Sequence, residues 1–377
     1  MPSPFRLSAL CLRLVPLVLV TGSYAQLFNP PINYDSGGYG PIAVALGDLN
    51  GDGKLDVVVA NINSGTIGVL LGNGDGTFQP AKTFPAGSYP FYVVLADFNH
   101  DGKLDVAVAN RNIYKGAPGQ VSILLGDGKG GFSSPVSYGA YSDAYSLAVG
   151  RFTRGGKLDI AVADTASGSL LLGNGDGTFR DGGLIGTQSP WAFAAKDLNR
   201  DHFQDLLAAD EAPFQVASLL GNGRGAFSQV WAGSTTTAPI ALAVGDFNRD
   251  GKVDVASADQ AFNNNGSNVA VFLGKSDGSF ASAVEYPVDA EPVSIAAGKL
   301  NRDGKLDLVT ANQFAGTLSI LLGNGDGTFQ PQISIPSGGI TPTSVAIGDL
   351  NGDGHADLVV AQPNGDAVSV LISTGKK

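Results

Sequence analysis

Aspartate and asparagine recur in this chain in a nine-residue pattern whose oxygen atoms are suited to holding a hard cation. The first copy has side-chain oxygens at positions 1, 3, 5 and 9 and a main-chain carbonyl at position 7, on Asp48, Asn50, Asp52, Asp56 and Lys54 respectively. Oxygen ligands at this spacing, with no histidine or cysteine among them, favour Ca2+ over zinc or copper. Glycine at position 6 allows the sharp turn that wraps such a loop around an ion. We therefore expect this copy to bind calcium.

The pattern occurs seven times, beginning at residues 48, 97, 151, 197, 246, 299 and 349. Three further copies are intact, and their expected ligands are Asp97, Asn99, Asp101, Lys103 and Asp105; Asp246, Asn248, Asp250, Lys252 and Asp254; and Asp349, Asn351, Asp353, His355 and Asp357. Aspartate and asparagine also form good turns without a metal. A bare turn, however, requires neither an acid at position 9 nor three carboxylates within nine residues, whose repulsion a cation relieves.

Two copies keep most of the pattern. The copy at 197 retains its side-chain ligands but has His202 where the turn favours glycine, so both calcium binding and a bare turn stay open there. In the copy at 299, Lys299 replaces the first acid. Its ammonium group would stand in for the ion in an internal salt bridge, with a bound ion as the alternative. The ligands that these two copies retain are Asp197, Asn199, Asp201, Asp205, Asn301, Asp303 and Asp307.

The copy at 151 has lost most of its oxygen ligands. Arg151, Thr153 and Gly155 stand at three ligand positions, and Asp159 alone remains. An ion pair between Arg151 and Asp159 is the expected substitute for the metal, so this loop is predicted to be metal-free.

The segments around each loop indicate the elements that position it. Every repeat has four short apolar stretches separated by turns rich in Gly, Asn and Asp, as at 42–47, 55–60, 68–76 (which ends in a Gly-rich turn) and 78–84. Four such strands per repeat describe a four-stranded antiparallel sheet, and the nearly continuous apolarity of the first two predicts burial on both faces. Seven repeats of about 50 residues predict an all-β fold, a seven-bladed β-propeller.

The two ends of the chain indicate how the ring closes. The last repeat stops after its third strand at 368–372, whereas the segment 28–34 resembles the fourth strand at 78–84. The N-terminal segment should therefore become the outer strand of the seventh blade and leave no free edge. Residues 26–377 would form the propeller.

Residues 1–25 have the features of a secretory signal peptide. Arg6 precedes a mostly apolar run, and the small residues Ser23 and Ala25 form a small-x-small cleavage site before Gln26. We expect a secreted or cell-surface protein without a membrane span. Removing this segment would take the net charge from −11 to −13, which disfavours nucleic acid as a partner. We expect a monomer.

The loops and a second motif together resemble a known family. The sequence Leu-Leu-Gly-Asn-Gly-Asp-Gly-Thr-Phe occurs at 70–78, 171–179 and 321–329. With the aspartate loops, it resembles FG-GAP/VCBS-type repeat proteins, a broad group that includes the integrin α-chain propeller. The resemblance implies a seven-bladed propeller with calcium between the first and second strands of a blade. It also implies adhesion, ligand or carbohydrate recognition, or attachment to an enzyme.

The sequence favours recognition over catalysis. All three histidines, His100, His202 and His355, lie inside the aspartate loops, so the usual nucleophile and base pairs have no base. We expect a module that binds carbohydrate or an extracellular protein, with calcium in a structural role. Two alternatives stay open: a calcium-dependent polysaccharide lyase or glycosidase, and a purely structural component of the cell surface.

The expected ligand-binding residues lie at the end of the propeller away from the aspartate loops. The loops between second and third strands and the connections between blades meet there, and the repeats differ most in these segments. Exposed aromatic and polar side chains suit sugars or protein partners, although the aromatic rings would serve equally well to fill the space between blades. The candidates are Tyr39, Tyr89, Arg111, Tyr114, Tyr141, Tyr145, Trp191 and Phe262.

Overall fold

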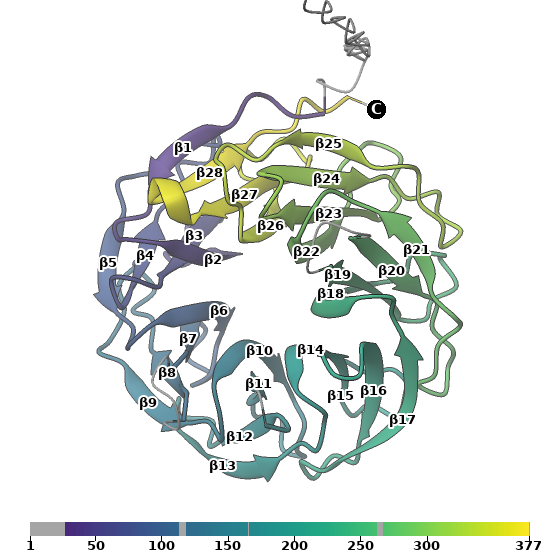
Figure 1. The fold of residues 1–377 in the computed structure, drawn as a ribbon. Coiled ribbons are helices and arrows are strands. Elements are labelled where there is room, and N and C mark those ends of the chain that lie inside the picture. Colours follow the sequence, from purple (N-terminus) through teal and green to yellow (C-terminus); the bar gives the residue numbers. More distant parts are fainter. Residues whose placement is uncertain (1–26, 113–117, 165, 262–266, 377) are drawn as a thin grey trace, which may run out of the picture.

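Seven four-stranded antiparallel sheets surround a common axis as the blades of a propeller (Figure 1). The computed structural model describes residues 27–112, 118–164, 166–261 and 267–376, and these residues contain 28 strands and one short 3-10 helix. The predicted all-β, seven-bladed architecture is confirmed. The expected signal peptide at 1–25 lies outside the described residues.

The first strand of each repeat lies nearest the axis, and the fourth lies at the rim (Figure 1). From the axis outward, the blades consist of β2 (Pro41–Gly47), β3 (Asp56–Asn61), β4 (Thr66–Leu70) and β5 (Lys82–Pro85); β6 (Pro90–Ala96), β7 (Asp105–Asn110), β8 (Gln120–Leu124) and β9 (Val136–Gly139); β10 (Ala144–Gly150), β11 (Asp159–Asp164), β12 (Ser169–Gly173) and β13 (Phe179–Leu184); β14 (Pro190–Lys196), β15 (Asp205–Asp210), β16 (Gln215–Gly221) and β17 (Phe227–Ser234); β18 (Ala238–Gly245), β19 (Asp254–Gln260), β20 (Asn268–Phe272) and β21 (Val284–Pro287); β22 (Pro292–Gly298), β23 (Asp307–Asn312), β24 (Thr317–Leu321) and β25 (Ile333–Pro336); and β26 (Ser344–Gly348), β27 (Asp357–Gln362), β28 (Ala367–Leu371) and β1 (Ile32–Asp35).

The N-terminal strand completes the seventh blade, as the sequence predicts. Strand β1 pairs antiparallel with β28, with Ile32 opposite Val370 and Asp35 opposite Ala367. A further bridge joins Phe28 to Ser373. The two ends of the chain are therefore held together by a full set of sheet hydrogen bonds, and β28 has no exposed edge.

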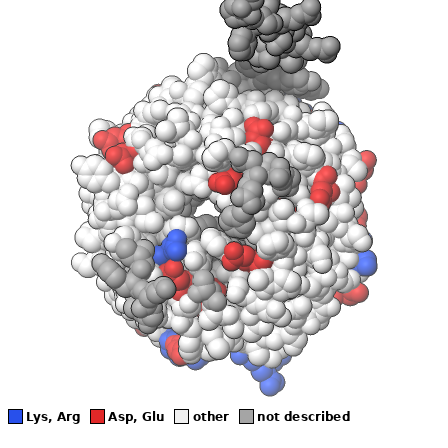
Figure 2. All heavy atoms as spheres, in the orientation of Figure 1, with Lys and Arg blue, Asp and Glu red and all other residues white. Residues whose placement is uncertain are grey.

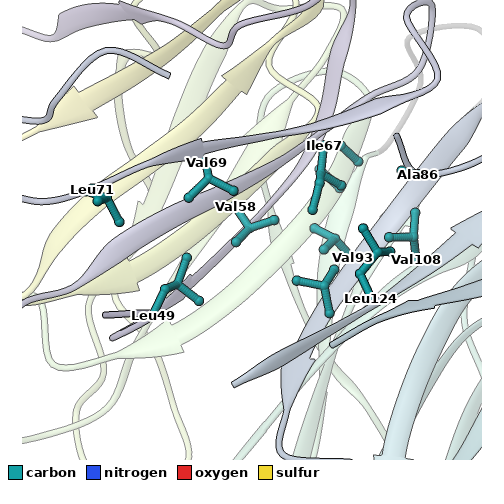
Figure 3. Close-up of a cluster of buried hydrophobic side chains, with 12 residues drawn as sticks. Leu49, Val58, Ile67, Val69, Leu71, Ala86, Val93, Val108 and Leu124 are labelled. Carbon is teal, nitrogen blue, oxygen red and sulfur yellow. The ribbon is translucent and has the colours of Figure 1, made fainter. Parts of the chain in front are cut away.

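The core consists of apolar layers between neighbouring blades. Every residue of β3 is buried, because its side chains alternate between two neighbours. Val57 and Val59 pack towards the seventh blade, whereas Val58 packs towards the second blade against Val93 (Figure 3). This burial on both faces explains why the second strand of each repeat is an almost unbroken apolar run.

The connections divide between two faces of the ring. The aspartate loops between first and second strands share one face with the turns between third and fourth strands, and we call it the aspartate-loop face. The other, variable-loop face carries the loops between second and third strands, including the helix η1 (Pro363–Gly365), and the connections between blades. Figure 2 shows the variable-loop face as mostly uncharged, with several acidic patches around a central hollow and one basic patch beside them. Within the described residues, no helix is long and apolar enough to cross a membrane.

Candidate functional site

The first aspartate of an intact loop is surrounded by backbone N–H groups. The Asp48 carboxylate accepts hydrogen bonds from the N–H groups of Asn50, Gly51, Asp52 and Gly53, at 2.7–3.3 Å. Burial by itself would raise the pKa of Asp48, but these four N–H groups outweigh it and lower the pKa below its ordinary value. The loop is thus wrapped around a carboxylate that stays ionised.

The loop at 197 wraps in the same way despite its missing glycine. The N–H of His202 donates to Asp197 at 3.0 Å, as Gly53 does to Asp48. To do so, His202 adopts a φ of 70°, in the left-handed region that favours glycine. The backbone of this copy therefore keeps the shape of the intact loops.

The last aspartate of the pattern is a buried bridge between two turns. Asp56 is fully buried, and its two carboxylate oxygens accept the N–H groups of Leu49 at 2.8 Å and Gly72 at 2.7 Å. Burial, together with repulsion from Asp52 and Asp48, raises its pKa, while the two N–H groups partly offset this effect. The bridge ties the start of the aspartate loop to the start of the next turn of the same blade.

All seven repeats contain this bridge. The bridging residues are Asp56, Asp105, Asp159, Asp205, Asp254, Asp307 and Asp357, each with 0% exposure. Each accepts an N–H from the second residue of its loop. A second N–H comes from the residue that ends its third strand or from the residue two places beyond that end. Sequence analysis assigned this position to metal binding and missed its role in joining the turns.

The donor atoms of the intact loops fit a calcium ion in their chemistry. They are hard oxygens, and the carboxylates at positions 1 and 5 are close enough to raise the pKa of the one at position 9. Among the described residues, however, no three acidic, histidine or cysteine side chains converge as a ready-made ion site. The position-7 lysines pair with the position-5 aspartates instead, as in Lys252 with Asp250 at 2.7 Å and Lys103 with Asp101 at 3.1 Å. A bound cation would displace these ammonium groups.

Two ion pairs predicted for the altered loops are wrong. Arg151 forms no ion pair with Asp159, which instead accepts the hydroxyl of Thr153 at 2.9 Å and three backbone N–H groups. Lys299 is exposed and forms no ion pair within the described residues, where Lys305 pairs with Asp303 at 3.3 Å. In both loops, bonds from nearby groups satisfy the retained acid, so a long side chain gains little by folding back over it.

A cavity of about 380 Å³ opens on the axis at the variable-loop face. All seven blades line it through the residue six places before each aspartate loop: Ile42, Phe91, Tyr145, Trp191, Ile240, Val293 and Thr343. The next residue in the second blade, Tyr92, also lines it, as do Gln260 and Gln313 from the fifth and sixth blades. We call this cavity the axial pocket. It lies in the hollow seen at the centre of Figure 2.

Charged groups hold the aromatic side of the axial pocket in place. The Arg111 guanidinium lies 4.9 Å from the ring centre of Phe91 and 4.6 Å from that of Tyr145, and it pairs with Asp143 at 3.1 Å. The Trp191 ring lies 4.4 Å from that of Tyr145. Its indole N–H donates to Glu211 at 2.8 Å. Cation–π contacts and ion pairs therefore order the three rings before any ligand arrives.

The structure brings together three of the residues expected to bind a ligand. Arg111, Tyr145 and Trp191 line the axial pocket, together with Phe91 and Tyr92, which sequence analysis missed. The remaining candidates divide into two groups: Tyr39, Tyr89 and Tyr141, which do not line the pocket, and Tyr114 and Phe262, which lie outside the described residues. Tyr39 is 68% exposed, and the hydroxyl of Tyr141 donates to Asp181 at 2.8 Å. From the sequence, Phe91 resembles a core residue of an apolar strand. The signal that could have identified it is its position six residues before the aspartate loop, which it shares with Tyr145 and Trp191.

A ring of buried polar residues supports the loops around the pocket. It comprises the last or next-to-last residue of each second strand: Asn61, Asn110, Asp164, Asp210, Asp259, Asn312 and Gln362. The amides of Asn61 and Gln362 donate to backbone carbonyls of the neighbouring connections. Burial raises the pKa of Asp210 to about 6 and that of Asp259 to about 8. One oxygen of Asp259 accepts the Ser257 hydroxyl at 2.6 Å, and the other has no partner among the described residues.

The fold and its loops define a repeat-built β-propeller whose blades each close on a buried aspartate. The FG-GAP-like repeat matches residues 48–108, 151–208, 197–257, 253–310 and 299–360, and the chain belongs to this family. The resemblance seen in the sequence is thereby confirmed. Among curated proteins, no sequence matches the chain.

Solved structures of low sequence identity share the fold. Two crystal structures of BBS1N in complex with ARL6DN, soaked with lead and with mercury, are 13% and 14% identical, with TM-scores of 0.62 and 0.65. Each match covers 92% of this chain and 97% of the other. A lectin from Agrocybe aegerita that recognises non-reducing terminal N-acetylglucosamine is 19% identical, with a TM-score of 0.52 over 78% of this chain and 80% of the lectin. At these identities the matches show a shared fold.

The buried bridge should stabilise the fold even in the loop at 151, which lacks most metal ligands. Replacing Asp159 with Ala leaves the buried N–H of Phe152 and the half-buried N–H groups of Thr153 and Gly173 without acceptors, at a cost of roughly 1–3 kcal/mol for a buried group and less for a half-buried one. We expect urea denaturation to show a loss of roughly 3–5 kcal/mol, equal with calcium and with chelator. A loss below about 1 kcal/mol would show that the bridge is dispensable.

Asp259 makes a prediction for the pH dependence of stability. Its pKa is about 8 in the folded chain and near 3.8 when unfolded, so the folded state binds more protons between these values. Its stabilising contribution should be complete below about pH 4 and should disappear as pH rises towards 8. Asp259→Asn should flatten this part of the stability curve and raise the melting temperature at pH 8, whereas Asn at exposed Asp35 should not. An unchanged slope in Asp259→Asn would contradict the assignment.

Proposed function

We propose that the chain is a secreted recognition module that binds a carbohydrate or extracellular protein ligand at the axial pocket, with calcium stabilising the loops at the opposite face. The observation that carries this proposal is the pocket itself. It is concave, mostly apolar, and has its aromatic rings ordered by Arg111 and Glu211. Ordered rings beside a few polar groups are typical of ligand sites, because little freedom is lost on binding.

Two further observations support recognition. The pocket opens on the face where the repeats differ most, which is where propellers and similar scaffolds carry function. A lectin that recognises a terminal sugar shares the fold, which makes carbohydrate the first ligand class to test. The signal-like residues 1–25 support secretion.

Calcium binding rests on the donor set and the shape of the loops. The four intact copies and the copy at 197 wrap backbone N–H groups around the first carboxylate. Side-chain oxygens at positions 3 and 5 and the position-7 carbonyl would hold the ion on the outer side of this wrapped turn. The buried aspartate at position 9 would contribute a remaining lone pair.

The calcium proposal predicts a rise in stability and a change in stoichiometry. Millimolar calcium should raise the melting temperature and chelator should lower it, because an ion held at 100 times its dissociation constant stabilises the fold by about 2.7 kcal/mol per site. In calorimetric titration, Asp52→Asn should reduce the number of bound ions by one. Asp75→Asn, in an exposed turn of the same blade where the Thr77 hydroxyl binds the carboxylate, should not. Equal stoichiometry in both variants would exclude the loop as a site.

The ligand proposal predicts that binding depends on the aromatic side of the pocket. On an array of glycans and extracellular proteins, the chain should bind a ligand without converting it to product. Trp191→Ala should abolish this binding. The melting temperature of the variant should stay within a few degrees of that of the parent. Tyr141→Ala, at an exposed ring outside the pocket, is the matched control. Release of unsaturated or hydrolysed sugar products would favour the polysaccharide-active enzyme, and binding to nothing would favour the structural component.

A further inference from the structure

The axial pocket has two unlike sides, although it is built from equivalent positions of seven repeats. Three consecutive blades place Phe91, Tyr145 and Trp191 at the position six residues before the loop. The other four blades place Ile, Ile, Val and Thr there. A ligand therefore meets aromatic rings, two of them partly covered by Arg111, on the side of the second to fourth blades, and aliphatic side chains and Thr343 opposite.

Two polar side chains of the pocket come from blades that contribute none of the three rings. Gln260 and Gln313 occupy equivalent positions in the fifth and sixth blades, directly after the buried polar residues Asp259 and Asn312. Neither side-chain amide has a hydrogen-bond partner among the described residues. Each amide offers two donors and one acceptor, a set that matches neighbouring hydroxyl groups on a ring. The hydroxyl of Ser294, also in the lining, accepts the N–H of Val345 at 3.2 Å and keeps its own proton to donate.

The charge of the pocket is already neutralised. Arg111 is the one charged residue among those that line it, and its guanidinium is bound to Asp143 and covered by two rings. An anionic ligand would have to compete with Asp143 for this group. A cationic ligand would find no free carboxylate in the lining. The pocket thus selects for a neutral ligand.

The depth of the pocket limits the ligand to the end of a chain. Its lining comes from the first halves of the inner strands, such as Trp191 to Phe193 of β14, and does not include their last residues beside the aspartate loops. The pocket therefore opens at the variable-loop face and stops inside the ring. A volume of about 380 Å³ is near the lower end of the range for ligand pockets, which suits one or two rings.

We propose that the axial pocket binds the terminal residue of a neutral glycan, with the C–H face of the sugar against Trp191 and its hydroxyl groups bonded to Gln260 and Gln313. This inference rests on the proposed recognition function and narrows its ligand class. A sugar ring has one apolar face and a rim of hydroxyls, as the two sides of the pocket require. A peptide terminus carries a charge for which the lining has no free counter-charge.

Methyl glycosides of glucose, galactose, mannose and N-acetylglucosamine test the proposal, with methyl glucuronide as the charged analogue. The chain has two tryptophans, and Trp191 lines the pocket while Trp231 packs against Phe272 in the outer part of a blade. At least one neutral glycoside should change the tryptophan fluorescence on saturation. The change should persist in Trp231→Phe and vanish in Trp191→Phe. Methyl glucuronide should bind at least tenfold more weakly than its neutral counterpart.

Substitutions of the two glutamines provide a second test of the proposal. Gln260→Ala and Gln313→Ala should each weaken calorimetric binding about tenfold or more with unchanged melting temperature. Gln330→Ala, at an exposed glutamine outside the pocket, should leave binding unchanged. Binding that survives both pocket substitutions, or tighter binding of the glucuronide, would overturn the inference while leaving a recognition function in place. Binding of a protein but of no glycoside would also overturn it, whereas failure to bind any ligand would reject the recognition function as well.

Discussion

Each blade depends on one buried carboxylate that joins two turns. The aspartate at position 9 is withdrawn from water, and its two oxygens accept N–H groups from the aspartate loop and from a residue at or just beyond the end of the third strand. Leaving such N–H groups unpaired would cost more than most single contacts contribute. The joined turns then touch the next blade, because the N–H of Gly130 donates to the carbonyl of Leu49 in the preceding loop at 3.2 Å. The bridge within a blade thereby sets the spacing between blades.

This constraint explains why the loops tolerate the loss of metal ligands. The third loop has lost the acids at positions 1 and 5, yet Asp159 keeps the same bridge and gains the Thr153 hydroxyl. The bridge is needed wherever a blade must close. The outer ligands are needed only where an ion is to be held. The two roles share one sequence pattern, so a copy with degenerate ligands still forms a complete blade.

Much of the fold could be predicted from the sequence, and the reasons for the failures are specific. The seven blades, their four strands and the closing role of 28–34 follow from a strong repeat and from strand alternation. Two long exposed side chains, those of Arg151 and Lys299, were misplaced because sequence does not show where such side chains point. For the same reason the ion pairs of Lys103 and Lys252 with the position-5 acids were not predicted. The aromatic surface was found in part, since Phe91 is indistinguishable from a core residue until the blades are arranged around an axis.

The arrangement around the axis also determines where specificity can arise. Seven identical blades would give a pocket with sevenfold symmetry, which could not hold an asymmetric ligand in one orientation. The aspartate loops and their bridges vary little and maintain the ring. At the position six residues earlier, by contrast, three neighbouring blades carry rings and four carry small or aliphatic residues. The residues that distinguish one ligand from another are therefore those at which the repeats differ on the inner strands. The repeated bridges hold these residues at equivalent positions around the pocket.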